Sequence, residues 1–240
     1  MRAQIEKHDV CFYQRDSEWL DALFKHLGSG LEGGQTLVVA ADSRHLKLLR
    51  EFLDSNDLNA ALLVASGVLI ELDAEHIREH LSAGGGVSAS RFSALAEKTF
   101  AGRHRRGAGQ MATVYGEIVD LYCRLGRVED AVELERLWNE AAKVYSLSLL
   151  CGYEMRPGKF TPDDVSSICA THQRCVAMDW DVDVARSLRR ALREHLGEKK
   201  ATELWAKLVV EQPRVPGHVS ALRWVQENVP EIGRAIESRN

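Results

Sequence analysis

A chain of 240 residues, 45% hydrophobic and 28% charged, has the composition of an ordinary globular protein. It is long enough for one sizeable α/β domain with a smaller appendage, or for two small domains. The net charge of −4 gives no overall positive field, so we do not expect direct nucleic-acid binding. The sequence shows no signal peptide and no apolar run of roughly 20 residues, so we expect a cytoplasmic protein without a membrane partner.

In the first hundred residues, apolar runs alternate with amphipathic segments. Asp16 has the character of an N-cap, and we expect the helix that it opens to end near Gly28, in a glycine-rich turn. Residues 35–41 are continuously apolar, which is typical of a strand buried on both faces of a parallel sheet. The expected elements here are strands at 8–13, 35–41 and 68–72, and helices at 16–28, 43–56, 74–81 and 88–100.

The alternation continues to residue 153, with strands at 110–115 and 147–153 and helices at 117–125 and 128–145. Such an order implies right-handed crossovers and a mainly parallel sheet covered by helices on both faces. We therefore expect an α/β fold of three layers.

After Pro157 the pattern becomes helical. Thr161 followed by Pro162 is typical of a helix start, and this helix carries Cys169 and His172. Further helices are expected at 182–196, 198–210 and 218–228, with a last turn from Pro230. We place a domain boundary near residue 180, with an α/β domain over 1–180 and a small all-helical extension over 181–240. The extension fits dimerisation or docking of a regulatory protein better than DNA recognition.

Over residues 5–178, short motifs occur in an order and spacing that resemble those of a known family of domains. In chain order they are His8, Phe12 and Tyr13; Gly34-x2-Leu37-Val38-Val39-Ala40-Ala41; Gly67-x-Leu69-x3-Asp73-Ala74; Tyr115-Gly116-Glu117-Ile118-Val119; Gly126-Arg127; Leu134-Glu135-x-Leu137-Trp138-Asn139-Glu140; Leu149-Leu150-Cys151-x-Tyr153; and Ile168-Cys169-Ala170-x-His172. Taken together they resemble the MEDS domain, the sensory domain named for methanogens, methylotrophs and the regulator DcmR.

The resemblance implies a fold similar to the KaiC and RecA branch of the P-loop ATPases. It also implies a sensory role, in which the domain binds a small molecule or a partner and passes the signal to a kinase or a DNA-binding domain. The chain departs from the family pattern at residues 83–87, where Ala-Gly-Gly-Gly-Val replaces a polar Asp-Gly-x-Pro-Asp segment.

A RecA-like fold raises the question of a phosphate site. A P-loop requires G-x-x-x-x-G-K-[ST], and neither residues 28–35 nor 102–109 satisfy it. Both segments also precede a strand instead of following one. Arg103, Arg105 and Arg106 could contact an anion or lie in a solvated turn. Because a nucleophile elbow is absent too, we expect no enzymatic activity.

Carboxylates follow three of the expected strands. Asp42, Asp73 and Glu117 would lie at the carboxyl ends of a parallel sheet, where ligands of open α/β sheets bind. Helix capping is the plainer interpretation of Asp42 and Asp73. Glu117 follows Gly116, which allows something to approach the backbone closely, so it is the stronger candidate for a ligand site.

A second set of candidates comes from the helix at 128–145. Glu135 and Asn139 lie one turn apart with Trp138 beside them, so they could form one wall of a pocket. His8 and Tyr13 could contribute from the first strand. The alternative is that Trp138 belongs to the core and that the polar side chains form a buried structural network.

The cysteines offer little chemistry. All five fit reduced thiols of a cytoplasmic protein, two or three of them in the core. In Cys169-x2-His172-x2-Cys175 the first and last residues point in different directions on a helix, so we expect no metal here and no cofactor elsewhere. His172 is instead included among the candidate ligand-binding residues.

These observations favour a non-catalytic sensory or regulatory protein of signal transduction or transcriptional control. It would bind an unknown small molecule, or a regulatory protein partner, and could form a homo-oligomer. The candidate ligand-binding residues are His8, Tyr13, Asp42, Asp73, Glu117, Glu135, Trp138, Asn139 and His172. The alternatives are a degenerate RecA-like protein that still binds ATP or GTP, and an adaptor or anti-sigma-like regulator without a ligand.

Overall fold

The computed structural model describes residues 7–83, 85–101, 112–156, 159–177, 190–211 and 225. The predicted domain boundary near residue 180, all of the helix at 218–228 except residue 225, and the turn from Pro230 lie outside these residues, as does the basic loop with Arg103, Arg105 and Arg106. None of the described helices has the length and apolar character needed to cross a membrane.

The described residues form a six-stranded sheet in the order β3-β2-β6-β7-β1-β8, and each neighbouring pair is parallel. Its strands are β1 (Lys7–Tyr13), β2 (Thr36–Ala41), β3 (Leu69–Asp73), β6 (Ala112–Gly116), β7 (Leu147–Glu154) and β8 (Arg174–Ala177). A short antiparallel hairpin, β4 (Ser82–Ala83) and β5 (Gly86–Val87), lies apart from the sheet.

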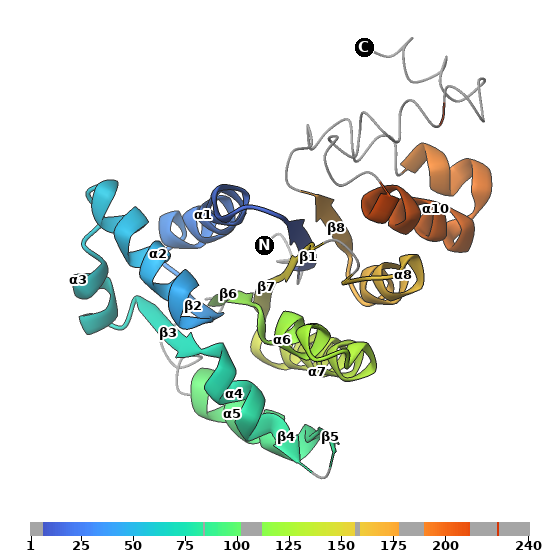
Figure 1. Ribbon diagram of the computed structural model, residues 1–240. Coiled ribbons are helices and arrows are strands. Elements are labelled where there is room, and N and C mark those ends of the chain that lie inside the picture. The colour runs from blue at the N-terminus through green and yellow to red at the C-terminus, as the bar shows by residue number, and fades with distance from the viewer. Residues whose placement is uncertain are drawn as a thin grey trace.

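Helices cover both faces of this sheet (Figure 1). On one side lie α1 (Asp16–Glu32), α2 (Ser43–Ser55) and α3 (Ala60–Ala65). On the other lie α4 (Ala74–Leu81), α5 (Ala89–Phe100), α6 (Ile118–Arg124), α7 (Val128–Tyr145) and α8 (Pro162–Ala170). Residues 190–196 are helical as well, and α10 (Glu198–Glu211) packs against α8. The prediction of a three-layer α/β fold with a helical C-terminal part is confirmed.

Strand alternation divides the interior into two cores. In β1, Val10 and Phe12 face the core under α4–α8, whereas Cys11 and Tyr13 face the core under α1–α3. The same alternation places Tyr115 of β6 with the second group. A side chain's position along its strand therefore decides which helical layer it meets.

Several predicted features hold in detail. Asp42 caps α2 by accepting a hydrogen bond from the backbone of His45, and Asp73 caps α4 in the same way through His76. Thr161 forms the expected capping box at the start of α8.

The first helix differs from its prediction at both ends. Its N-cap is Arg15, not Asp16, because the Glu18 carboxylate accepts hydrogen bonds from the backbone N–H groups of Gln14 and Arg15. It also continues past Gly28 to Glu32. The glycines here serve close packing, since a Cβ on Gly30 would lie 2.8 Å from the Thr113 Cβ.

Other differences lie in short elements. The helix α3 and the β4–β5 hairpin were not predicted. The trailing helix ends at Ala170, so that residues 174–177 form an additional strand beside β1 instead of continuing the helix. Cys169, expected as a reduced thiol, is disulfide-bonded. Cys11, Cys123 and Cys151 are free and buried.

The two glycines of α1 give a direct test of this packing. We expect Gly30→Ala to lower the free energy of unfolding by about 1–3 kcal/mol, because the added methyl group overlaps Thr113. Gly28→Ala, which meets nothing within 4 Å, should raise it by up to about 1 kcal/mol through helix propensity. Urea unfolding of both variants measures the difference, and an equal effect of the two substitutions would contradict the close contact.

Candidate functional site

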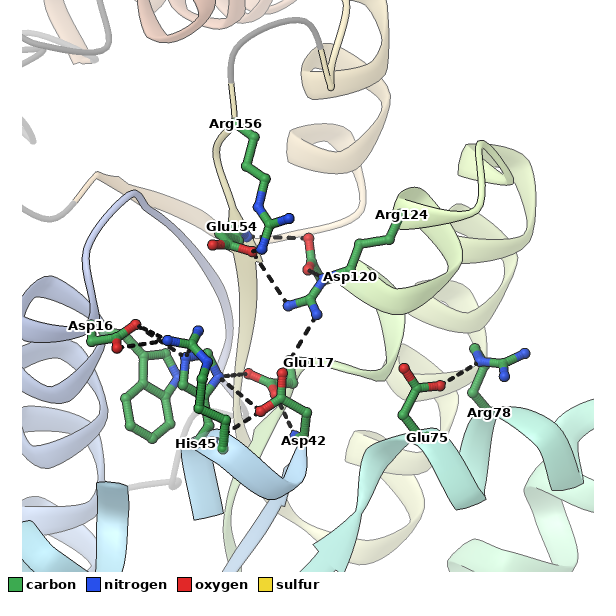
Figure 2. A network of polar contacts seen from close by, with 12 residues as sticks. Asp16, Asp42, His45, Glu75, Arg78, Glu117, Asp120, Arg124, Glu154 and Arg156 are labelled. Atoms are coloured by element: carbon green, nitrogen blue, oxygen red, sulfur yellow. Dashed lines mark hydrogen bonds and ion pairs between the residues drawn. The ribbon is translucent and has the colours of Figure 1, made fainter. Parts of the chain in front are cut away.

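Charged side chains gather where three strands of the sheet end. Asp42 follows β2, Glu117 follows β6, Glu154 ends β7, and Asp120 and Arg124 come from α6 (Figure 2). Together with His45 of α2 they form what we call the strand-end network. The carboxyl ends of parallel strands are where open α/β sheets bind ligands.

Glu117 is the hub of one half of the strand-end network. Its carboxylate is fully buried and accepts hydrogen bonds from the backbone N–H of Asp42 (2.5 Å) and from the ring of His45 (Nδ1, 2.7 Å). The Tyr115 hydroxyl donates a third at 3.3 Å, and itself accepts from the Trp19 indole at 2.7 Å. The Trp19 ring also stacks on His45, with 4.1 Å between ring centroids.

Arg124 is the hub of the other half. Its Nε donates to Asp120 at 2.7 Å, its Nη1 to Asp42 at 3.4 Å, and its Nη2 lies 3.5 Å from Glu154. Burial alone would lower the pKa of Arg124, but the Asp120 carboxylate raises it further than burial lowers it. The guanidinium is therefore a fixed positive charge among three carboxylates.

Three buried polar atoms around the strand-end network have no hydrogen-bond partner within the described residues. They are the Tyr13 hydroxyl, Arg124 Nη2 and Glu154 Oε2. The last two are 3.5 Å apart, and Glu154 Oε2 also forms an ion pair with Arg156 Nη2 at 2.6 Å, so of the three atoms the Tyr13 hydroxyl alone has no polar contact within the described residues. Burial, together with the charges of Glu117 and Asp120, raises the pKa of Tyr13, so this hydroxyl keeps its proton. Buried polar groups normally have a partner, and this hydroxyl is therefore the group here that a further molecule could satisfy.

A metal ion does not suit this network. Asp42, His45 and Glu117 do bring potential ligand atoms within 4.8 Å of one another. However, Arg44 donates to His45 Nε2 at 3.0 Å, so the ring proton sits on Nδ1 and is directed to Glu117. His45 thus has no free lone pair to offer.

A second polar cluster lies inside the core under α7 and α8. It consists of His8, Glu135, Cys151 and His172, and we call it the His–Glu cluster. His8 Nε2 is 3.1 Å from one Glu135 oxygen, His172 Nε2 is 3.3 Å from the other, and the Tyr153 hydroxyl donates to Glu135 at 2.6 Å.

The pKa values in the His–Glu cluster are set by burial and by the neighbouring ionisable groups. Burial alone would raise the pKa of Glu135, but His172 and His8 lower it to well below its usual range. Burial alone would lower the pKa of His8, but the hydrogen bond and charge of Glu135 raise it. The same burial raises the pKa of Cys151.

The predicted site residues thus divide among separate places. Asp42, Glu117 and Tyr13 belong at the strand-end network, whereas His8, Glu135, Asn139 and His172 meet in or beside the His–Glu cluster. Asp73 is the exposed N-cap of α4 and joins neither group.

Trp138 has a different environment from Glu135 and Asn139, its expected partners. Its ring packs edge-on against Phe92 and Phe100 beside an apolar space of about 10 Å³, which has room for about one water molecule. The indole is part of the core in this conformation, as the alternative interpretation proposed.

Sequence reasoning missed His45, Asp120, Arg124, Glu154, Cys151 and Tyr153. The i, i+4 spacing of Asp120 and Arg124 directly after a predicted strand was a usable signal. Cys151 and Tyr153 were hidden because a mid-strand position gives no indication of a polar neighbour.

Comparison with known proteins gives one match. A family model described as MEDS, the methanogen/methylotroph, DcmR sensory domain, matches residues 7–173. That range contains all the residues of the strand-end network and the His–Glu cluster. No curated protein matches the chain.

Asp42 allows a test of the charges in the strand-end network. Burial alone would raise the pKa of Asp42, but the backbone N–H of His45 and the charge of Arg124 lower it. Its charge therefore stabilises the fold fully above the usual aspartate pKa of about 3.9, and the contribution is lost as the pH falls below that value. We expect the loss of stability in Asp42→Asn to be largest at neutral pH and to shrink in acid.

Urea unfolding of wild type and variant between neutral pH and about pH 3 measures this change. Asp73→Asn alters an N-cap outside the network and reports the effect of the same substitution at an ordinary cap. A loss in Asp42→Asn that does not change with pH would show that capping, not charge, is the role of Asp42.

Proposed function

The chain belongs to the MEDS family of sensory domains, and from that premise we propose that it is a non-catalytic sensor that recognises a small polar molecule at the strand-end network. The observation that supports this proposal most strongly is the buried Tyr13 hydroxyl, which has no hydrogen-bond partner within the described residues. It lies at the carboxyl ends of the strands beside Arg124 Nη2 and Glu154 Oε2, which form ion pairs but no further hydrogen bond within the described residues. Together they offer the hydroxyl of Tyr13, a guanidinium N–H of Arg124 and a carboxylate oxygen of Glu154.

The charges of the site suggest the class of ligand. Arg124, Arg156 and Lys159 face the carboxylates of Asp42, Glu117, Asp120 and Glu154, so the site has no strong excess of one sign. A neutral or zwitterionic molecule that both donates and accepts hydrogen bonds fits such a site better than a multiply charged anion. Its binding would replace or complete the contacts of Arg124.

A nucleotide is the less favoured ligand because the strand-to-helix junctions are short. Gln14 and Arg15 alone separate β1 from α1, and single residues, Asp42 and Glu117, separate two further pairs. None of these described junctions has the length or the glycines of a phosphate-binding loop. Between β7 and α8, the Lys159 ammonium is already paired with Asp120 and donates to the Glu154 carbonyl at 3.0 Å.

The position of the site also suggests how a signal would leave it. Glu154 ends β7, and the chain continues from there to α8, which packs against α10. A ligand that draws Arg124 away from Glu154 would loosen the start of this connection. We therefore propose that α8 and the helices after it report the state of the site to a regulatory partner, in a cytoplasmic signalling system.

Native mass spectrometry of the purified protein tests the ligand directly. We expect gentle ionisation to show an additional mass of a small organic molecule that disappears on denaturation. Arg124→Gln and Tyr13→Phe should reduce its occupancy, because each removes one of these donors. Arg136→Gln, which removes an exposed arginine on α7 that pairs with Glu133, serves as the matched control.

The possible outcomes separate the three functions. A mass of ADP, ATP or GTP would support the nucleotide-binding alternative. A protein without any bound molecule, found only with itself or with another protein, would contradict the small-molecule proposal and favour an adaptor.

A further inference from the structure

The His–Glu cluster joins four segments that are far apart in the sequence. His8 comes from β1, Glu135 from α7, Cys151 from β7, and His172 from the turn after α8. Their side chains are almost completely buried, with exposed fractions of 2% for His8 and 0% for Glu135 and His172. The four ligand-type atoms all lie within 4.8 Å of one another.

The hydrogen bonds behind the cluster fix the tautomer of His8. The Asn139 amide N–H₂ donates to the Thr171 carbonyl at 2.8 Å, which can only accept. The Asn139 amide oxygen therefore faces His8 Nδ1 at 3.0 Å, and this nitrogen must carry the proton. Nε2 of the neutral ring then directs its lone pair toward Glu135 and Cys151.

His172 is held in the same way. Its Nδ1 lies 2.7 Å from the Ile168 carbonyl oxygen, so this nitrogen also carries a proton and donates it. Its Nε2 points to Glu135 and has no hydrogen-bond partner within the described residues. The Nε2 atoms of two imidazoles therefore converge on a carboxylate and a cysteine sulfur, and each would offer a lone pair to a metal once the ring is neutral.

We propose that His8, Glu135, Cys151 and His172 together bind one Zn²⁺ ion. Two histidines, a carboxylate and a thiolate form a donor set that zinc accepts in tetrahedral geometry. This inference stands on the His–Glu cluster alone and does not rest on the proposed sensory site. It differs from the expectation of the sequence analysis, in which no metal was foreseen.

The spacing of the ligand atoms fits a tetrahedral ion. Zinc bonds of about 2.0–2.3 Å place neighbouring ligands about 3.3–3.8 Å apart. His8 Nε2 lies 3.1 Å from Glu135 Oε2 and 3.3 Å from Cys151 Sγ, and these two atoms lie 3.2 Å apart. His172 Nε2 lies 3.3 Å from the other oxygen, Glu135 Oε1, and the ligand atoms of the four residues all lie within 4.8 Å of one another. A rotation of the His172 ring and of the Glu135 carboxylate would bring the four atoms to tetrahedral spacing.

Charge balance and outer contacts support the same assignment. Two neutral imidazoles, one carboxylate and one thiolate neutralise Zn²⁺, so the buried site carries no net charge. Each histidine donates its second ring N–H, to Asn139 or to the Ile168 carbonyl, and the Tyr153 hydroxyl donates to Glu135. Such partners orient the ligands of protein zinc sites.

The site is structural in character because the four protein ligands leave no open position for a substrate. An ion there would fasten the turn after α8 to β1 and β7. Since α8 carries the packing of α10, zinc would fix the attachment of the C-terminal helices to the α/β domain.

The test begins with the protein purified from zinc-supplemented cells without a tag that binds metal. Elemental analysis should find one zinc per chain. The metal is then removed by unfolding with a chelator, and the chain is refolded with Co²⁺ as a spectroscopic probe. We expect the intense visible bands of tetrahedral Co²⁺ and a near-ultraviolet thiolate-to-cobalt charge-transfer band, both lost when Zn²⁺ displaces Co²⁺.

Variants assign the ligands. Cys151→Ser should abolish the charge-transfer band, whereas Cys11→Ser, which changes a buried free thiol of β1 that belongs to the other core, should keep it. Asn139→Ala leaves all four ligands in place but frees the His8 ring, so Zn²⁺ affinity should fall by about 10–100-fold.

Two results would overturn the proposal. One is a natively purified, folded protein without zinc whose refolded form shows only the weak spectrum of hydrated Co²⁺. The other is a charge-transfer band that survives in Cys151→Ser.

Discussion

The ion pairs of Arg124 join the start of α2, the helix α6 and the end of β7. The guanidinium contacts Asp42 at the start of α2, Asp120 on its own helix and Glu154 at the end of β7 (Figure 2). Asp42 and Glu154 lie on segments that leave the sheet toward opposite helical layers. Because a buried charge is tolerated only with a partner, the positions of these three carboxylates depend on one another through Arg124.

The two polar sites stand on the same pair of adjacent strands. His8 and Tyr13 lie near opposite ends of β1, and Cys151 and Glu154 lie in the middle and at the end of β7. The His–Glu cluster lies inside the core, where four ligands converge without reaching solvent. The strand-end network lies at the edge of the sheet, where its hydrogen bonds are incomplete. In the proposed function, ligand binding at the strand-end network would move the segment that follows β7, whereas the His–Glu cluster would hold the turn after α8 in place.

Local sequence patterns predicted most elements of the fold. The apolar run of β2, the caps Asp42 and Asp73, and the Thr161-Pro162 helix start depend on neighbouring residues and were predicted correctly. The length of α1 was not, because Gly30 is required by its close packing against Thr113 of β6, a residue far away in the sequence. The strand β8 was missed because it is four residues long and its pairing with β1 is a contact across more than 160 residues.

The candidate sites show the same difference between features that depend on neighbouring residues and contacts between residues far apart in the sequence. Half of the side chains that define the two sites were named from the sequence, as Glu117, Glu135 and His8 illustrate. The sequence could not show that these side chains form two separate groups. That separation depends on the register in which the strands pair. The orientation of His8 by Asn139, which determines its chemistry, comes from a hydrogen bond between residues 131 positions apart.

The contacts of Arg124 control how firmly the end of β7 and α8 are held. Hydrogen exchange of wild type and Arg124→Gln, followed by mass spectrometry, measures this most directly. We expect faster exchange in α8 and α10 of the variant, with β3 and α3 unchanged, because only the first two lie beyond the contact of Arg124 with Glu154. An increase confined to α6, with α8 and α10 protected as in wild type, would contradict this role of Arg124.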